Sequence, residues 1–317
     1  PHPGFLDRSG PTTPIVKHSK RIRYLAEYVL LQFSLGLIRV APLKPAVRCA
    51  EALGSLAFLL LASKRRIAIA NILACNITDS PKEARRIACD SFRHFGAMLI
   101  ESIQAETRLT EDNWRDSVEI KMSDDTLATV SKPGLGVIMV TAHFGNWEVA
   151  AQCMSFIKPV VAVARRMNNP YTDDLIQNRK NAHRFRIVPK YGSFAKRLIT
   201  PIENGEILAM LSDQHTRHSG VVVNFLGRPA SCHTSPARLH LMTGAPMCFA
   251  FCVRLGLMKY RLESLPIIRH TPTGDRDADV RTILKTLTSE LETAIRANPE
   301  QYLWAHRRWR VDQSCSV

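Results

Sequence analysis

The sequence lacks the short motifs that identify several large enzyme classes. Neither Gly-x-Ser-x-Gly, nor a Gly-Lys-Ser/Thr phosphate-binding loop, nor Gly-x-Gly-x-x-Gly occurs in the 317 residues. Nucleophile-elbow hydrolases, P-loop enzymes and dinucleotide-binding folds depend on these turns. Those three classes are therefore excluded. No internal repeat or low-complexity segment is visible either.

Paired cysteine and histidine ligands are also missing. The eight cysteines are scattered, with no Cys-x-x-Cys, and several lie in apolar segments. This usage predicts reduced, mostly buried thiols in a cytoplasmic compartment. His215, His218 and His233 invite a zinc interpretation, but the His-x2-His spacing has no companion ligand pair. We therefore expect no metal.

Acidic residues are scarce relative to basic ones. The chain has 43 Lys and Arg against 28 Asp and Glu, a formal net charge of +15. Such a balance favours a polyanionic partner: nucleic acid, an anionic membrane surface or an acidic protein. The basic residues are not interleaved with aromatics as in nucleic-acid-binding proteins. Basic clusters at 17–23 and 64–66 instead flank apolar helical stretches, as in membrane-surface proteins.

The N-terminal third reads as helical. We expect a disordered basic tail over 1–23, a helical region over 24–115 and an α/β core over 116–312, with 24–312 as one structural unit. The expected helices are Tyr24–Val40, Ala46–Ala62, Arg65–Leu73, Pro81–Gln104 and a short one at Glu111–Arg115. Tyr24–Val40 is at the short edge for a transmembrane helix, and an interfacial anchor or a buried helix stay open. No cleavable signal peptide fits the sequence.

From about residue 119 the periodicity changes to alternating strands and helices. Expected strands are Gly136–Thr141, Val160–Arg165, Arg186–Pro189, Ile207–Leu211, Val221–Phe225, Met247–Arg254 and Tyr260–Ile268. Expected helices are Trp147–Phe156, Tyr171–His183, Ser193–Glu203, Ser235–Thr243 and Ala278–Ala297. The alternation predicts an α/β fold with a mixed, largely parallel central sheet flanked by helices.

The segment from Gly136 to Ala150 carries the strongest candidate site. An apolar run, typical of a strand buried on both faces, ends in His143-Phe-Gly-Asn-Trp-Glu148, and a helix follows. In α/β proteins ligands bind where a strand's carboxyl end meets a helix. With Glu148 one turn into the helix, its carboxylate could steer the His143 imidazole as a general base. Asn146 could cap that helix.

His143-x4-Glu148 resembles the His-x4-Asp/Glu motif of the glycerolipid acyltransferase superfamily, and in particular its branch that adds late, secondary acyl chains to lipid A. Similar segments follow in order along the chain. They are Arg165 to Ile176 (Arg-Arg-Met-Asn-Asn-Pro-Tyr-Thr-Asp-Asp-Leu-Ile), Asp213-Gln214, Gly220 to Ala230 with Pro236 to Leu239 and Thr243 to Pro246, and Pro299 to Trp309. The matches run from about residue 24 to 310. The resemblance implies a glycerolipid acyltransferase-like core preceded by a membrane-associating helical region.

The resemblance also implies roles for individual residues. His143 would deprotonate an acceptor hydroxyl that attacks a thioester carbonyl directly, and Glu148 would fix the imidazole tautomer. Arg165 would bind a phosphate of the acceptor or of the carrier's pantetheine arm, although Arg166 stands where the family usually has proline. Asp213 and Gln214 could line the same crevice or form a plain turn. Arg228 is a second candidate anion contact, and Asn146 is included among the candidate substrate-binding residues.

The resemblance further implies no cofactor beyond the acyl donor, either acyl-acyl carrier protein or acyl-coenzyme A. It implies a lipid A precursor as acceptor and a location at the cytoplasmic face of the inner membrane. Two alternatives stay open. One is an acyltransferase of the same fold acting on another glycolipid, such as a phosphatidylinositol mannoside. The other is a catalytically silent membrane-binding homologue. Trp304 and Trp309, beside the cations 306–308, suit a membrane interface or packing on the sheet.

Overall fold

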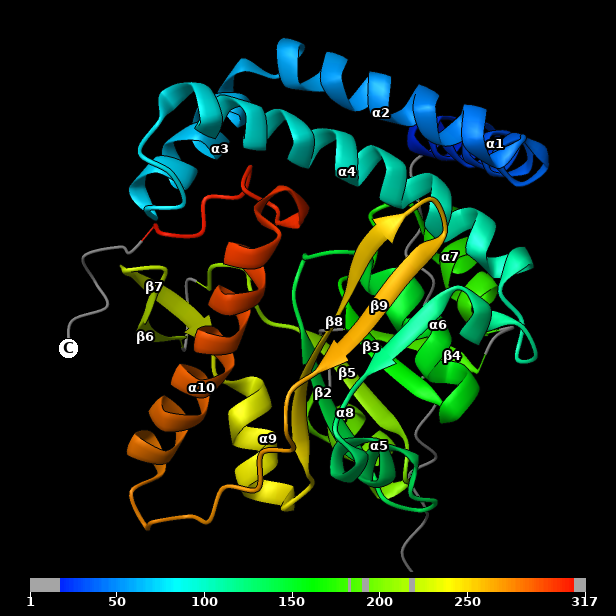
Figure 1. Ribbon diagram of the computed structural model, residues 1–317. Helices are drawn as coiled ribbons and strands as arrows, with labels where there is room; N and C mark the ends of the chain where they lie inside the picture. The colour runs from blue at the N-terminus through cyan, green and yellow to red at the C-terminus, as the bar shows by residue number, and fades with distance from the viewer. Residues whose placement is uncertain (1–17, 182–183, 190–193, 217–219, 311–317) are drawn as a thin grey trace, which may run out of the picture.

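The computed structural model describes residues 18–181, 184–189, 194–216 and 220–310 (Figure 1). At its centre is a seven-stranded sheet in the order β1-β9-β8-β2-β5-β3-β4. Neighbouring strands are parallel except β8 and β9, which are antiparallel. The strands are β1 Val118–Lys121, β2 Val137–Thr141, β3 Val160–Ala164, β4 Phe185–Pro189, β5 Ile207–Leu211, β8 Met247–Gly256 and β9 Lys259–Ser264. The predicted mixed, largely parallel sheet is confirmed.

Both faces of the sheet are buried, which explains the continuous apolar run in β2. Val137 and Met139 belong to one hydrophobic core, and Ile138 and Val140 belong to the core on the other face. Successive side chains of a strand point to opposite faces, so a strand between two cores needs apolar residues at every position. β2 is therefore the doubly buried strand that its sequence predicted.

Helices cover the two faces of the sheet. They are α5 Asp124–Ser131, α6 Trp147–Ile157, α7 Pro170–Asn181, α8 Phe194–Glu203, α9 Ser235–Thr243 and α10 Arg276–Ala297. Side chains of α8, α9 and α10 join the core that contains Ile138, and side chains of α6 join the other core. The end of the predicted helix Tyr171–His183 and the start of Ser193–Glu203 lie outside the described residues.

A separate two-stranded hairpin, β6 Gly220–Phe225 and β7 Arg228–His233, packs beside α10 (Figure 1). Its turn residues Leu226 and Gly227 both have positive φ, 52° and 76°. Positive φ at both central residues is the usual geometry of a tight two-residue hairpin. The hairpin therefore turns at Leu226 and Gly227.

Three short features between the helical region and β2 differ from the sequence-based prediction. The prediction of a helix at Glu111–Arg115 is wrong, because only a single 3-10 turn, Trp114–Asp116, forms there. Asn113 ends the preceding helix by accepting the Thr110 amide (2.8 Å) and donating to the Arg108 carbonyl (3.0 Å). The strand β1 and the helix α5 were not predicted, since each is too short to show a period.

Four helices form the N-terminal region and lie across one end of the sheet (Figure 1). They are α1 His18–Val40, α2 Leu43–Leu60, α3 Ala62–Ala74 and α4 Pro81–Arg108. The disordered tail expected over 1–23 is wrong for residues 18–23, which form the first turns of α1; residues 1–17 lie outside the described residues. An ion pair between Arg23 and Glu27 (3.2 Å, one helical turn apart) supports these turns.

Two glycines bring α2 and α4 into close contact. A Cβ on Gly54 would lie 2.5 Å from the Phe92 carbonyl oxygen, and a Cβ on Gly96 would lie 2.4 Å from that of Ala50. Neither position therefore accommodates a side chain without moving a backbone. The pair fixes the spacing of the two helices, and α4 in turn contacts the sheet and the C-terminal segment, where Ser91 Oγ donates to the Tyr302 carbonyl (2.7 Å).

Across the described ranges, no helix taken singly combines the length and the apolar character needed to cross a membrane. α2 and α3 taken together would meet that test by length and composition, but a bend of 92° separates them.

Candidate active site

The turn after β2 is held by the backbone of two other segments. The Gly145 N–H donates to the Gln301 carbonyl (3.0 Å), and the Asn146 N–H donates to the Cys252 carbonyl in β8 (2.7 Å). Gly145 has a φ of +61°, and a Cβ there would lie 2.0 Å from the Cys252 oxygen, so no other residue fits. The turn that carries His143 is therefore built by the sheet and the C-terminal segment together.

Asn146 caps α6, as its sequence position predicted. Its Oδ1 accepts the Val149 amide (3.1 Å) and the Ser102 hydroxyl (3.0 Å), and the residue is fully buried. A side chain that is fully buried beneath the turn does not reach a ligand in the cleft. The structure thus corrects the substrate-binding assignment of Asn146 to a structural one.

His143 is paired through Nδ1 with Asp213, whereas the sequence suggests Glu148 as the carboxylate that orients the imidazole. Its Nδ1 lies 2.8 Å from Asp213 Oδ1, and its backbone N–H donates to Asp213 Oδ2 at 3.0 Å. Asp213 follows β5, which lies next to β2 in the sheet. The Asp213 carboxylate therefore binds both the backbone and the side chain of His143.

This pairing determines the chemistry that the imidazole can perform. With Asp213 ionised, Nδ1–H donates to the carboxylate and the Nε2 lone pair is left to accept a proton. Burial opposes the charge of Asp213, but the hydrogen bonds from His143 and the positive charge of Arg308 outweigh it, so the pKa of Asp213 lies below its usual value. The Nε2 atom faces the Gln214 amide at a long 3.5 Å. The arrangement is that of a general base with its orienting acid.

The His143 imidazole opens into a cleft of about 470 Å³ at the carboxyl ends of β2, β5 and β3. The lining comprises His143, Trp147, Glu148, Val163, Ala164, Arg165, Met210, Leu211, Ser212, Gln214, His233, Ser235 and Pro236. Three predicted residues, Glu148, Arg165 and Gln214, thus share the cleft with His143. Four of these lining residues, Met210, Leu211, Val163 and Pro236, are apolar.

Arg228 does not reach this cleft. It begins β7, and its guanidinium lies over the ring of Trp309, 5.5 Å from the ring centre. Its prediction as an anion contact of the site is therefore wrong, because the first residue of β7 points toward the C-terminal segment. Trp309 in turn stacks on Phe225 (ring centres 5.6 Å apart, planes 10° apart), and Trp304 is fully buried. Packing, not a membrane interface, accounts for these tryptophans.

Two buried polar residues near the site were not predicted. His94 on α4 places Nε2 3.1 Å from the Gly145 carbonyl, and burial lowers its pKa to about 4, so the ring is neutral and donates to the turn. Arg308 is 2% exposed and donates to the Ser231 carbonyl (2.6 Å) and to Cys232 Sγ (2.8 Å). A histidine among apolar residues and an arginine beside tryptophan are not distinctive in sequence.

Arg308 and Asp213 are oppositely charged neighbours in the interior. Both line one small cavity together with Phe225, Phe249 and leucines of α10. The hydrogen-bond acceptors of the Arg308 guanidinium, the Ser231 carbonyl and Cys232 Sγ, carry no full charge. Asp213 therefore supplies the negative charge that a buried cation requires, and Arg308 helps keep Asp213 ionised.

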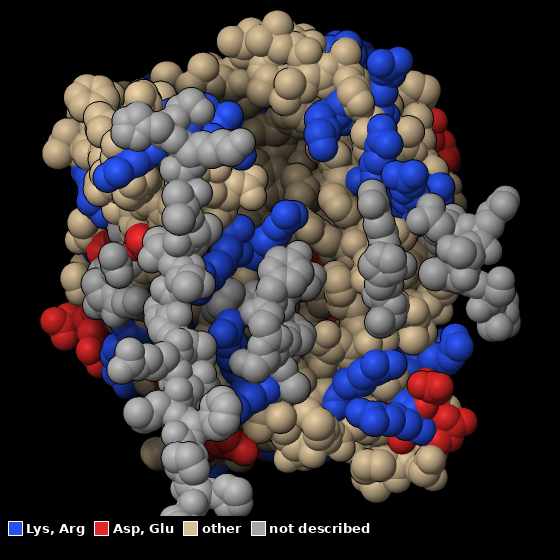
Figure 2. Space-filling view, turned by 180° about the vertical axis from the view of Figure 1, so that it is seen from behind, with Lys and Arg blue, Asp and Glu red and all other residues tan. Residues whose placement is uncertain are grey.

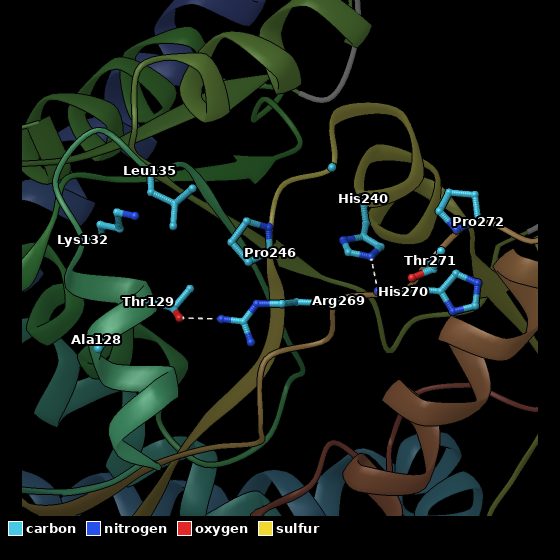
Figure 3. Close-up of a pocket in the computed structure, with 11 residues that line it drawn as sticks. Ala128, Thr129, Lys132, Leu135, His240, Pro246, Arg269, His270, Thr271 and Pro272 are labelled. Atoms are coloured by element: carbon cyan, nitrogen blue, oxygen red, sulfur yellow. Dashed lines mark hydrogen bonds between the residues drawn. The ribbon is translucent and has the colours of Figure 1, made fainter.

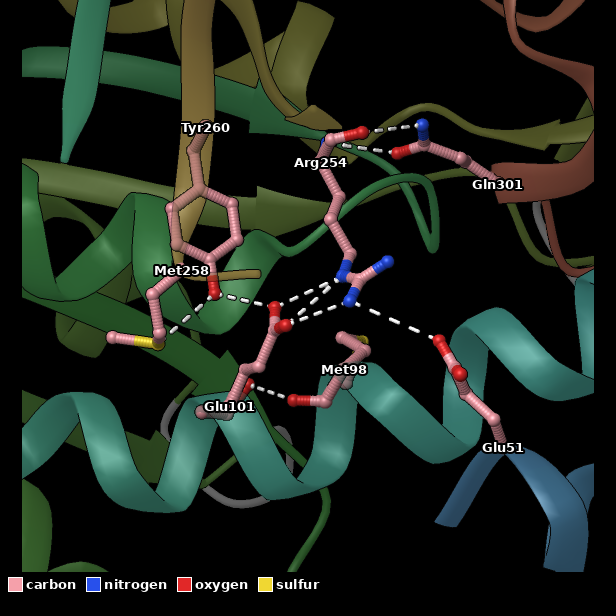
Figure 4. Close-up of polar contacts among 8 residues, drawn as sticks. Glu51, Met98, Glu101, Arg254, Met258, Tyr260 and Gln301 are labelled. Carbon is pink, nitrogen blue, oxygen red and sulfur yellow. Dashed lines mark hydrogen bonds and ion pairs between the residues drawn. The ribbon is translucent and has the colours of Figure 1, made fainter. Parts of the chain in front are cut away.

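A buried ion pair locks α4 to the strands behind the histidine turn (Figure 4). Arg254 on β8 donates to Glu101 on α4 at 2.8 Å, and the Tyr260 hydroxyl on β9 donates to the same carboxylate at 2.6 Å. The Gln301 side chain pairs with both backbone groups of Arg254, at 2.9 and 3.0 Å. Since Gln301 also accepts the Gly145 amide, this network fixes the turn relative to the helical region.

A larger cavity of about 620 Å³ lies at the amino ends of β2 and β8, at the opposite edge of the sheet (Figure 3). Its arginine and histidine side chains already have protein partners. Arg269 donates to Asp125 (3.0 Å) and to Thr129 (2.9 Å), and His270 pairs with Asp279 (2.7 Å). The cleft at His143 is therefore the better active-site candidate.

The zinc interpretation of three histidines gains no geometric support. His218 lies outside the described residues. Within the ranges that the structure describes, no three His, Cys, Asp or Glu side chains gather as a metal site would require.

A family model for bacterial lipid A biosynthesis acyltransferases matches residues 15–311. The chain is 25% identical to the lipid A biosynthesis palmitoleoyltransferase of Escherichia coli K12 over 90% of this chain and 92% of that protein. It is 25% identical to the lauroyltransferase of the same organism over 87% and 89%. It is 23% identical to a phosphatidylinositol mannoside acyltransferase of Mycobacterium tuberculosis over 72% of each chain.

Proposed function

The chain belongs to the bacterial lipid A biosynthesis acyltransferase family, and from that premise we propose that it transfers a fatty acyl chain from an acyl carrier protein thioester to a hydroxyl of a lipid A precursor. The observation that carries the proposal is the His143 imidazole, held at Nδ1 by Asp213 and open at Nε2 to a cleft that also contains Arg165 and Glu148. These residues suit a hydroxyl nucleophile, a thioester and an anionic substrate.

In the proposed reaction the acyl chain passes directly from the thioester to the acceptor hydroxyl, without an acyl-enzyme intermediate. His143 Nε2 accepts the proton of the acceptor hydroxyl as its oxygen attacks the thioester carbonyl. The tetrahedral intermediate collapses with cleavage of the carbon–sulfur bond, and the imidazolium returns the proton to the departing thiolate. Asp213 steadies the transient imidazolium by its short hydrogen bond. The products are an ester and a free thiol.

Glu148 keeps a proposed role in the same step. It lies one turn into α6 and lines the cleft beside His143. Because Asp213 occupies Nδ1, we assign Glu148 to the substrate side of the imidazole, where its carboxylate orients the acceptor hydroxyl or stabilises the positive charge that develops. Arg165, at the carboxyl end of β3, supplies a cation for a substrate phosphate.

We place the enzyme at the cytoplasmic face of the inner membrane. Large apolar side chains of α1 and α2 are exposed, including Phe33 (70%), Leu30 (67%) and Leu60 (71%). Side chains of this size are seldom exposed to water in such number. Figure 2 shows the face opposite to that of Figure 1, where Lys and Arg side chains border a hollow and acidic side chains are few. A basic surface beside apolar helices suits anionic lipid and an acidic carrier protein.

The proposal is tested by mass spectrometry of lipid A from a strain that lacks this protein. Lipid A should lose one secondary acyl chain, and the wild-type gene should restore it while His143→Ala should not. In parallel, purified enzyme is assayed with acyl-carrier-protein and acyl-coenzyme A donors. Unaltered lipid A, with transfer instead to a mannosylated phosphatidylinositol, would keep the acyltransferase and replace the acceptor. No transfer to any glycolipid would contradict the proposal.

A further inference from the structure

A second cleft lies beside the first and is bounded by the N-terminal helix. It has a volume of about 490 Å³ and lies between α1 and the loop that joins β3 to α7. Its lining consists of Arg23, Tyr24, Glu27, Arg165, Arg166, Met167, Asn168 and Asn169. Arg165 lines both this cleft and the cleft of His143. The two clefts therefore adjoin at one arginine.

Asn169 fixes α1 against the loop. Its Nδ2 donates to the Tyr24 carbonyl (2.9 Å) and to Glu27 Oε2 (3.0 Å), and its Oδ1 accepts the Tyr171 amide (3.1 Å) at the start of α7. The Asn169 side chain is buried, so these bonds are shielded from water. Tyr28 and Tyr171 pack together next to them, with ring centres 6.2 Å apart. α1 is thus a fixed wall of the cleft.

The cleft has more positive than negative charge. Arg23 is paired with Glu27 at 3.2 Å. Within the described ranges, Arg165 and Arg166 have no carboxylate at ion-pair distance. The nearby Asp173 is occupied by the Met167 amide (2.9 Å) and the Gln177 amide (2.8 Å). Three arginines thus line this cleft with one carboxylate, Glu27, which is already paired with Arg23.

We infer that Arg23, Arg166 and Arg165 bind a phosphate group of a substrate, and that α1 completes this site. The inference rests on the proposed function insofar as the phosphate belongs to the molecule that reacts at His143. Guanidinium groups bind phosphate in a bidentate manner, and a dianion matches two arginines that have no ion-pair partner among the described residues better than a carboxylate does. Arg165, shared by both clefts, links the bound phosphate to the reacting end. The phosphate comes either from a phosphorylated sugar of the acceptor or from the phosphopantetheine arm of the donor.

The test is direct binding, measured by calorimetry on the full-length protein in detergent. The probes are glucosamine 1-phosphate against glucosamine, and 4′-phosphopantetheine against pantetheine. Wild type should bind the phosphorylated member of at least one pair more tightly. Arg23→Gln and Arg166→Gln should each weaken that binding about five- to tenfold and leave the unphosphorylated member unaffected. Binding should also weaken with added salt.

Arg281→Gln, which removes an exposed arginine on α10, is the matched control and should bind as wild type does. A loss confined to glucosamine 1-phosphate assigns the site to the acceptor, and a loss confined to phosphopantetheine assigns it to the donor. Equal binding of phosphorylated and unphosphorylated probes, or unchanged binding in both arginine variants, overturns the inference. Phosphate-dependent binding without acyl transfer to any acceptor would instead contradict the proposed function and leave the site in place.

Discussion

At the scale of single residues, the contact that matters most is that between His143 and Asp213. The two residues are 70 positions apart, and both the backbone and the ring of the histidine are bound to one carboxylate. A histidine and a glutamate five positions apart suggested another partner. That partner, Glu148, follows from how far a side chain can reach back along a helix. Such a distance says nothing about residues on a neighbouring strand.

The first prediction separates the two carboxylates near His143. Asp213→Asn should lower kcat about 100-fold or more, because an amide at Nδ1 favours the tautomer that carries its proton on Nε2. Glu148→Gln should retain the tautomer and lose less activity. Steady-state kinetics on purified variants, with their melting temperatures, make the comparison. An inactive Glu148→Gln beside an active Asp213→Asn would restore the original pairing with Glu148.

The second prediction concerns His94 and pH. Its pKa is lowered to about 4 by burial, against a reference of 6.5, so the unfolded chain binds a proton that the folded chain does not. The unfolding free energy should therefore fall as pH drops from 6.5 toward 4, by up to about 3 kcal/mol. His94→Gln keeps a donor for the Gly145 carbonyl and should flatten this slope. Urea titrations between pH 7 and 4 measure it, and equal slopes in both proteins would refute the assignment.

At the scale of secondary-structure elements, the contact between α2 and α4 determines how the helical region sits on the sheet. α4 carries His94, Ser91 and Glu101, each of which reaches a part of the histidine turn or its support. Movement of α4 would therefore disturb the site. The glycines at the contact set its spacing.

The third prediction compares two glycine-to-alanine changes. Gly96→Ala should destabilise the protein by about 1–3 kcal/mol, since its Cβ would meet the Ala50 carbonyl at 2.4 Å. Gly36→Ala, in α1, meets no atom within 4 Å and should stabilise by about 0.5–1 kcal/mol. Thermal unfolding of both variants gives the two signs. A stable Gly96→Ala would mean that α2 and α4 can move apart freely.

At the scale of the whole molecule, the apolar surface of α1 and α2 adjoins the cleft region through α1. The helix that presents Phe33 and Leu30 outward also presents Arg23 and Tyr24 to the second cleft. A surface that docks on lipid would thereby bring the two clefts to the headgroups, where an amphiphilic acceptor lies.

The fourth prediction follows from that placement. The double variant Phe33→Ser and Leu60→Ser should bind vesicles containing anionic lipid about tenfold less than wild type, because it exposes less apolar area to the acyl region. Cosedimentation with phosphatidylglycerol vesicles measures binding, and Met242→Ser, an exposed apolar side chain on α9, is the control. Equal loss in the control would show that the effect is general and not due to α1 and α2.

The alternation of strands and helices after residue 119, the doubly buried β2, the capping role of Asn146 and the order of the family motifs could all be predicted from the sequence. They depend on periodicity and turn chemistry between residues close in the chain. Only the tertiary structure decided that β5 and not β3 lies beside β2, which brings Asp213 to His143. The tertiary structure also determines that Arg308 is buried near Asp213 and that Arg228 packs on Trp309 instead of reaching the His143 cleft. It places α1 in contact with Asn169. Strand order and helix docking depend on contacts between distant segments, and a local pattern carries no record of them.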